Sequence, residues 1–171
     1  MTHSELITLY QQQELTVNKQ KYFNDYFKLN LKLGHLVENY IIEHYLLHMG
    51  SIISRSNDNN YDIKIQRPNG KQYTFEVKCD TRTHETNNLA IEYKEKRKLS
   101  GISVCEADYW IHYDLYNNVA YVFPTEKLRD ITFDGYENDK LNGVKCGFNN
   151  TSHCVLVPIH NKELRNIMDI L

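Results

Sequence analysis

The chain has 171 residues, the length of one ordinary domain, and a formal net charge of -2 with 25% charged residues. This balance excludes a uniformly basic nucleic-acid coat and an acidic disordered tail, so a polyanionic partner would need a local basic patch. The first residues lack the cationic start and apolar core of a signal peptide, and no apolar run approaches the length of a membrane span. We expect a single domain over residues 1–171, cytoplasmic and with no membrane partner.

The first half of the chain predicts helices followed by a β-hairpin. We expect a short helix at 4–15, a stronger helix at 31–49 that stops at Gly50, a strand at 51–56 and a hairpin at 61–80 around the loop 68–70. Residues 1–30 are taken as an N-terminal helical segment, and residues 31 to about 124 as the core of the domain.

The second half predicts strands mixed with short helices. We expect strands at 88–94, 108–115, 119–124 and 153–159, a short helix capped by Thr125 that ends before 131, irregular chain at 134–152, and a closing helix at 162–171 capped by Asn161. This order predicts the mixed α+β (α/β) class, with a mixed sheet flanked by helices. The four cysteines, which include no CxxC pair, are expected to be free thiols: Cys79, Cys105, Cys146 and Cys154.

The register of the hairpin decides which side chains share a face. A two-residue turn would mix apolar and charged groups on both faces, whereas a three-residue loop sets Ile63 opposite Phe75 on one apolar face. The same register sets Asp62 opposite Glu76, with Lys78 on the same face. Two opposed carboxylates repel unless a cation lies between them, so the pattern favours a divalent metal such as magnesium beside a lysine. The alternative is a solvated surface ion-pair cluster of small energetic value.

Glu38 stands out on the predicted helix 31–49. Its neighbours three, four and seven residues later are Ile41, Ile42 and Tyr45, and an isolated carboxylate in that setting is costly to keep ionised. A metal would provide a partner. A protonated side chain, a lysine from elsewhere or a wetter helix flank would also explain it.

The order Gly34-x3-Glu38, Asp62, Glu76-x-Lys78 resembles the PD-(D/E)xK nuclease superfamily, which includes restriction endonucleases and archaeal-type Holliday junction resolvases. Tyr61 stands where the family motif has proline. The later stretch 86–113 is similar to small phage-type or bacterial members. The resemblance implies a restriction-endonuclease-like fold for the core.

By this resemblance Glu38, Asp62, Glu76 and Lys78 are the catalytic residues. Asp62, Glu76, the backbone carbonyl of Val77 and Glu38 would bind Mg²⁺, with Mn²⁺ able to substitute. Lys78 would be the catalytic lysine. The resemblance therefore implies an endonuclease that cleaves DNA through a metal-activated water, with a homodimer as the natural assembly because both strands must be cut. A junction resolvase or an exonuclease of the same superfamily is the first alternative, and a nucleic-acid-binding protein without turnover is the second.

Two basic segments are candidates for phosphate contacts, or else solvated faces. The first is the loop with Lys94, Lys96, Arg97, Lys98 and Ser100. Further candidates for the DNA cleft lie near this loop in the sequence: Asn88, Glu92 and Gly101. The second comprises Lys19, Lys21, Lys28 and Lys32. The sequence has no P-loop and no dinucleotide fingerprint, so no nucleotide cofactor is expected.

Overall fold

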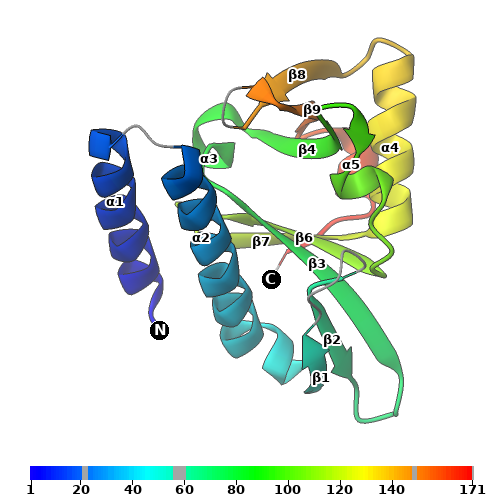
Figure 1. Cartoon of the computed structure of the whole chain (residues 1–171). Helices are drawn as coiled ribbons and strands as arrows, with labels where there is room; N and C mark the ends of the chain where they lie inside the picture. The colour runs from blue at the N-terminus through cyan, green and yellow to red at the C-terminus, as the bar shows by residue number, and fades with distance from the viewer. Residues whose placement is uncertain (21–22, 56–60, 148–149, 171) are drawn as a thin grey trace.

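The computed structural model describes residues 1–20, 23–55, 61–147 and 150–170, and it has the expected mixed α/β class. Two long helices open the chain, α1 (His3–Gln20) and α2 (Phe23–His44), and they pack side by side (Figure 1). A short 3-10 helix, η1 (Leu46–His48), follows. The helix α1 continues past the predicted end at 15, and α2 begins before the predicted start at 31, because no proline interrupts these segments. At its other end α2 stops at His44, short of the predicted 49, and η1 occupies the remaining turn. Gly34 lies inside α2, in open space.

The larger sheet has six strands in the order β1-β2-β3-β6-β7-β10. All neighbours are antiparallel except β3 and β6, which run parallel. The strands are β1 (Ser51–Arg55), β2 (Ile63–Gln66), β3 (Gln72–Asp80), β6 (Tyr109–Asp114), β7 (Val119–Pro124) and β10 (Asp169–Ile170).

The predicted hairpin register is confirmed, since Ile63 pairs with Phe75 and Ile65 with Tyr73. The backbone N–H of Arg67 donates to the carbonyl of Lys71 at 2.9 Å and closes the three-residue loop.

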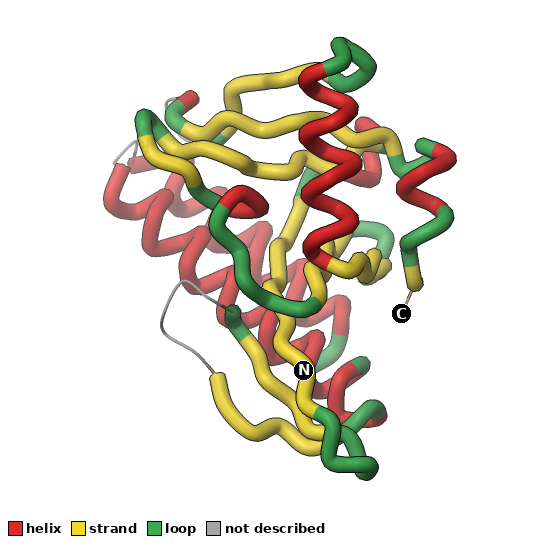
Figure 2. Tube along the Cα trace, turned by 90° about the vertical axis from the view of Figure 1, so that its right-hand side faces the viewer, coloured by secondary structure: helices red, strands yellow, loops and turns green. Residues whose placement is uncertain are grey.

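The smaller sheet has four strands in the order β5-β4-β9-β8, and two short elements lie beside it (Figure 2). Its strands are β4 (Asn88–Glu95), β5 (Lys98–Leu99), β8 (Asn142–Cys146) and β9 (Ser152–Pro158). The short helix α3 (Thr83–Thr86) precedes β4, and the 3-10 helix η2 (Gly101–Ser103) follows β5. The connection from β3 to its parallel neighbour β6 therefore runs through the smaller sheet.

Several sequence predictions about the second half were wrong. The helix α4 (Thr125–Glu137) continues well past residue 131, and β8 occupies part of the segment expected to be irregular, because β8 is stabilised by pairing with β9. The closing helix is only α5 (Lys162–Arg165), after which β10 pairs with β7. Its cap is as predicted, because the Asn161 side chain accepts from the Leu164 N–H at 3.0 Å.

Thr125 does not cap α4. Pro124 holds the N-cap position, and the Thr125 hydroxyl is buried without a hydrogen-bond partner among the described residues.

Two hydrophobic cores lie on the two faces of the large sheet. The first includes Ile41, Phe75 and Ile111 and is covered by α1 and α2. The second includes Trp110 and Phe123 and lies between β6, β7, the small sheet and α4. Along β3 the side chains alternate between these faces, so Phe75 and Val77 belong to the first core while Glu76 and Lys78 point to the other side.

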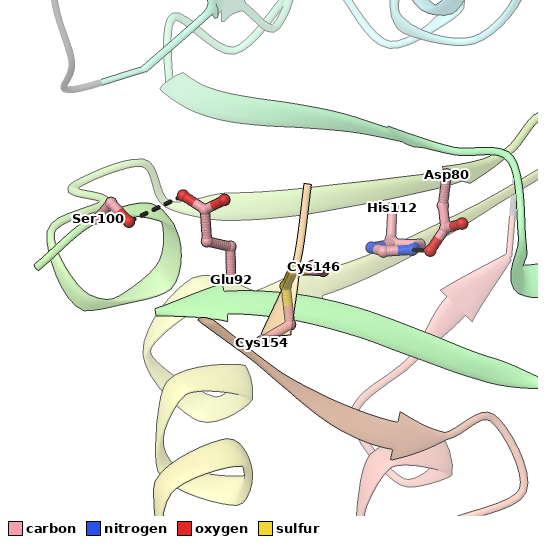
Figure 3. Close-up of a disulfide and its surroundings, with 6 residues drawn as sticks. All are labelled: Asp80, Glu92, Ser100, His112, Cys146 and Cys154. Carbon is pink, nitrogen blue, oxygen red and sulfur yellow. Dashed lines mark hydrogen bonds and ion pairs between the residues drawn. A yellow bond between two sulfur atoms is a disulfide. The ribbon is translucent and has the colours of Figure 1, made fainter. Parts of the chain in front are cut away.

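The prediction of four free thiols was wrong for two of them. Cys146 on β8 and Cys154 on β9 form a disulfide (Figure 3), whereas Cys79 and Cys105 are free. The pairing of β8 with β9 in the folded chain brings together two cysteines that form no CxxC pattern in the sequence. Within the described ranges, no helix combines the length and the apolar character that a membrane crossing requires.

Candidate active site

The base of the β2-β3 hairpin positions Asp62 beside β3. The Asp62 N–H donates to the Phe75 carbonyl at 2.9 Å, and the Asp62 carboxylate accepts from the Val77 N–H at 2.7 Å. One oxygen of Asp62 is therefore directed at the backbone on which Glu76 and Lys78 stand. The Val77 side chain is buried in the first core, so this residue has only backbone groups to offer to the site.

Glu76 and Lys78 form an ion pair on the same face of β3. Lys78 Nζ donates to Glu76 Oε1. The Lys78 side chain is 42% exposed and the Glu76 side chain is 13% exposed. Lys78 Nζ also lies 5.7 Å from the centre of the Trp110 ring, within reach of a cation-π interaction. The lysine thus lies between a half-buried carboxylate and the solvent.

Burial raises the pKa of the Glu76 carboxyl, and the negative charges of Asp62 and Glu38 raise it further, against the opposing effect of Lys78. Burial alone would lower the pKa of Lys78, but the charge and hydrogen bond of Glu76 and the charge of Asp62 outweigh it and raise the pKa. The Glu76 carboxyl therefore interacts with the charges of Lys78, Asp62 and Glu38, and Lys78 with those of Glu76 and Asp62.

Glu38 stands on α2, which packs against β3, and its charge acts on the Glu76 carboxyl. The Glu38 side chain is 16% exposed, and its carboxylate lies 3.4 Å from Nδ1 of His35. The expectation that Glu38 needs a partner is thus met by a histidine three residues earlier, which the sequence analysis overlooked. The spacing of three residues on a helix was the available signal.

The donor set suits a hard divalent cation, because it consists of carboxylate oxygens around a half-buried glutamate with charged neighbours. The side chains do not form a ready ligand shell: among the described residues, no group of three or more His, Cys, Asp or Glu is close enough to hold an ion. Glu76 is turned toward Lys78 and Asp62 toward the Val77 N–H. A metal would have to replace these two contacts.

The predicted basic loop is exposed at Lys96, Arg97 and Lys98, and the residues 95–100 line an open pocket. Lys94 is half-buried at the end of β4. Of the second basic segment, Lys28 and Lys32 are exposed on α2, while Lys21 lies outside the described residues.

Ser100 and Gly101 attach the basic loop to β4. The Ser100 hydroxyl donates to the Glu92 carboxylate at 2.8 Å (Figure 3). Gly101 has φ +51°, and a Cβ there would lie 2.3 Å from the Glu92 carbonyl oxygen, so the close approach requires glycine. Asn88 makes a local contact, from its side-chain amide to the Thr86 carbonyl at 2.8 Å. These contacts place the loop on β4.

A buried acid–histidine pair next to the cluster was missed. His112 is the partner of Lys78 in the β3-β6 ladder, and its Nε2 lies 2.9 Å from Asp80 Oδ2 (Figure 3). Asp80 continues the alternation of Glu76 and Lys78 along β3, which was the available signal. His112 had no visible partner in the sequence because the parallel pairing of β3 with β6 is non-local.

Comparisons with known proteins add no family to this geometry. No protein-family model, no curated protein and no solved structure matches the chain.

Proposed function

We propose that the protein is a magnesium-dependent deoxyribonuclease that hydrolyses phosphodiester bonds of DNA. The observation that supports this most is the gathering of Asp62 and Glu76 at the base of one hairpin, with Lys78 paired to Glu76 and the charge of Glu38 acting on the same carboxyl. Two acids beside one lysine, with the charge of a third acid acting on Glu76, are costly for a purely structural surface, since the like charges repel.

Asp62 and Glu76 would bind the metal, with the Val77 carbonyl and Glu38 as further oxygen donors. Bound there, a divalent ion would acidify a water molecule and withdraw charge from the phosphate. The acids of this chain hold the position of that ion relative to β3, and the apolar core behind Val77 keeps the strand rigid.

Lys78 acts in this proposal as a charge donor and not as a base. Its raised pKa keeps the side chain protonated at neutral pH. With Glu76 as a metal ligand, the ammonium group of Lys78 would be free to donate to a phosphate oxygen on which charge develops. Such donors contribute about 100-fold to 1000-fold in rate when they are aligned with the reacting group.

The test compares the native protein with Lys78→Ala on supercoiled, linear and four-way-junction DNA, with magnesium or with a chelator. We expect native cleavage only with magnesium and a loss of about 100-fold or more in the variant. Lys140→Ala, an exposed lysine remote in the chain, is the control. Magnesium-dependent cutting that survives Lys78→Ala contradicts the assigned role of the lysine.

The same assay separates the alternatives. Preference for the four-way junction supports a resolvase, cutting confined to linear ends supports an exonuclease, and binding with no product on any substrate supports a non-catalytic DNA-binding protein. A homodimer in the cytoplasm is part of the proposal, and sedimentation of the purified protein with and without DNA tests the dimer.

A further inference from the structure

The hairpin that carries the candidate site is strongly cationic toward its tip. Between Asp62 and Glu76 the chain has Lys64, Arg67 and Lys71 and no acidic residue, in a protein whose net charge is -2. This segment extends away from the rest of the large sheet, at the lower right of Figure 1. It is therefore a local positive protrusion that begins at the acids of the site.

Two of these cations are held over one aromatic ring. The guanidinium carbon of Arg67 lies 4.8 Å, and Nζ of Lys71 lies 4.9 Å, from the centre of the Tyr73 ring. The hydrogen bond and the charge of Tyr73 have the largest effects on the pKa of Lys71 and raise it, and the charge of Arg67 opposes them weakly. We call Arg67, Lys71 and Tyr73 the tip clamp.

The clamp has unused binding capacity. Among the described residues, neither cation forms an ion pair with a carboxylate. The Arg67 Nε is buried and has no hydrogen-bond partner there. Two cations without a carboxylate partner match the negative charge of a phosphate group and its several acceptor oxygens.

The position of the clamp determines which phosphate it can reach. Lys71 precedes Glu76 by five residues, about 16 Å along an extended strand, which corresponds to roughly five base-pair steps of duplex DNA. Residues 67, 71 and 73 also belong to the face of the hairpin opposite to Glu76, since partners across the ladder share a face. A DNA strand that contacts both the tip clamp and Glu76 must cross the edge of the hairpin. The phosphate bound by the clamp is therefore not the one that is cleaved.

We infer that the tip clamp binds a backbone phosphate of the DNA substrate several nucleotides from the cleaved bond. This inference rests on the proposed function for the identity of the substrate. The clamp supplies affinity and register through charge and reads no base, because a phosphate carries no sequence information.

The experiment measures binding of a fluorescein-labelled 20-base-pair DNA duplex by anisotropy, in chelator, across a series of salt concentrations. We expect the double variant Arg67→Ala and Lys71→Ala to bind about tenfold more weakly near physiological salt and to lower the slope of log affinity against log salt by about 1 to 2. The charge-conserving pair Arg67→Lys and Lys71→Arg should retain most of the slope. Lys127→Ala with Lys140→Ala, which removes two exposed charges elsewhere, is the matched control.

The inference is overturned if the double alanine variant keeps an intact thermal transition and shows the same affinity and the same salt slope as the native protein. Equal losses in the control pair overturn it as well, because they reduce the effect to net charge. Binding in chelator needs no turnover, so failure of the nuclease proposal would appear separately, as absence of magnesium-dependent cleavage by the native protein. Where cleavage occurs, the clamp variant should raise KM and leave kcat unchanged.

Discussion

At the scale of single residues, the most constrained charge outside the acid cluster is Asp80. Burial alone would raise the pKa of its carboxyl, but hydrogen bonds from His112 and from the N–H groups of Arg82 and Thr83 hold the pKa well below its usual range. The native protein therefore binds the Asp80 proton less readily than the unfolded chain does. Asp80 contributes stability that is fully present well above the unfolded pKa, near 3.9, begins to decline below it, and is lost only as the pH falls through the lower pKa of the folded protein.

Asp80→Asn should therefore be most costly at neutral pH and less costly in acid. We expect the free energy of unfolding to fall by about 2 kcal/mol at pH 7, because a charged hydrogen-bond acceptor to His112 is lost. The loss should be smaller at about pH 3, where the unfolded chain is mostly protonated but the native carboxyl is still ionised. Urea unfolding at both pH values measures the difference. Asp130→Asn, at an exposed position on α4, is the control and should change little. The same loss at both pH values would show that the charge of Asp80 is not the cause.

At the scale of elements, the edge strand β8 depends on its partner β9. Its burial is low, with Asn142, Gly143 and Lys145 exposed, and the disulfide from Cys146 to Cys154 is the covalent link between the two strands. Such a bond over a loop of this length restricts the unfolded chain by about 2 to 3 kcal/mol in the chain-entropy treatment. The small sheet should therefore respond to reductant.

We expect dithiothreitol, or Cys146→Ser, to lower the thermal midpoint of the protein, and the variant to be insensitive to reductant because it lacks the bond. Thermal unfolding with and without reductant gives the shift, and Cys79→Ser serves as the control for a cysteine outside the disulfide. Alkylation and mass spectrometry of the unreduced protein provide the direct check. Four reactive thiols in that measurement would rule the disulfide out in solution.

At the scale of the whole molecule, the two cores share the large sheet. Ile111 and its neighbour Trp110 on β6 belong to different cores although they are adjacent in the chain. Loosening one core should therefore destabilise the other, because the strands of the shared sheet cannot unfold on one face alone.

Ile41→Ala in the first core tests this coupling, since Ile41 is fully buried on α2. The cavity should cost about 2 to 5 kcal/mol. Trp110, the single tryptophan, reports from the second core, so its fluorescence transition should shift together with the helical signal in circular dichroism. Ile53→Ala, at an exposed position on β1, is the control. A fluorescence transition that stays in place while the helical signal shifts would mean that the two halves unfold independently.

The sequence by itself determined the features that depend on neighbours along the chain. The strand period of two residues and the loop 68–70 set the hairpin register, and with it the common face of Glu76 and Lys78. A register shift of one residue would move every side chain of the strand to the opposite face of the sheet. The Asn161 cap is local in the same way.

The tertiary structure decided whatever depends on contacts between distant segments. The strand β8, the disulfide and the pair of His112 with Asp80 come from strand pairing between segments far apart or across a loop, and no local pattern encodes such pairing. The nearness of Glu38 to Glu76 also follows only from the packing of α2 against β3. The helical period shows which way a side chain points on its own helix. Which residues lie next to that side chain depends on how the helix packs against the sheet.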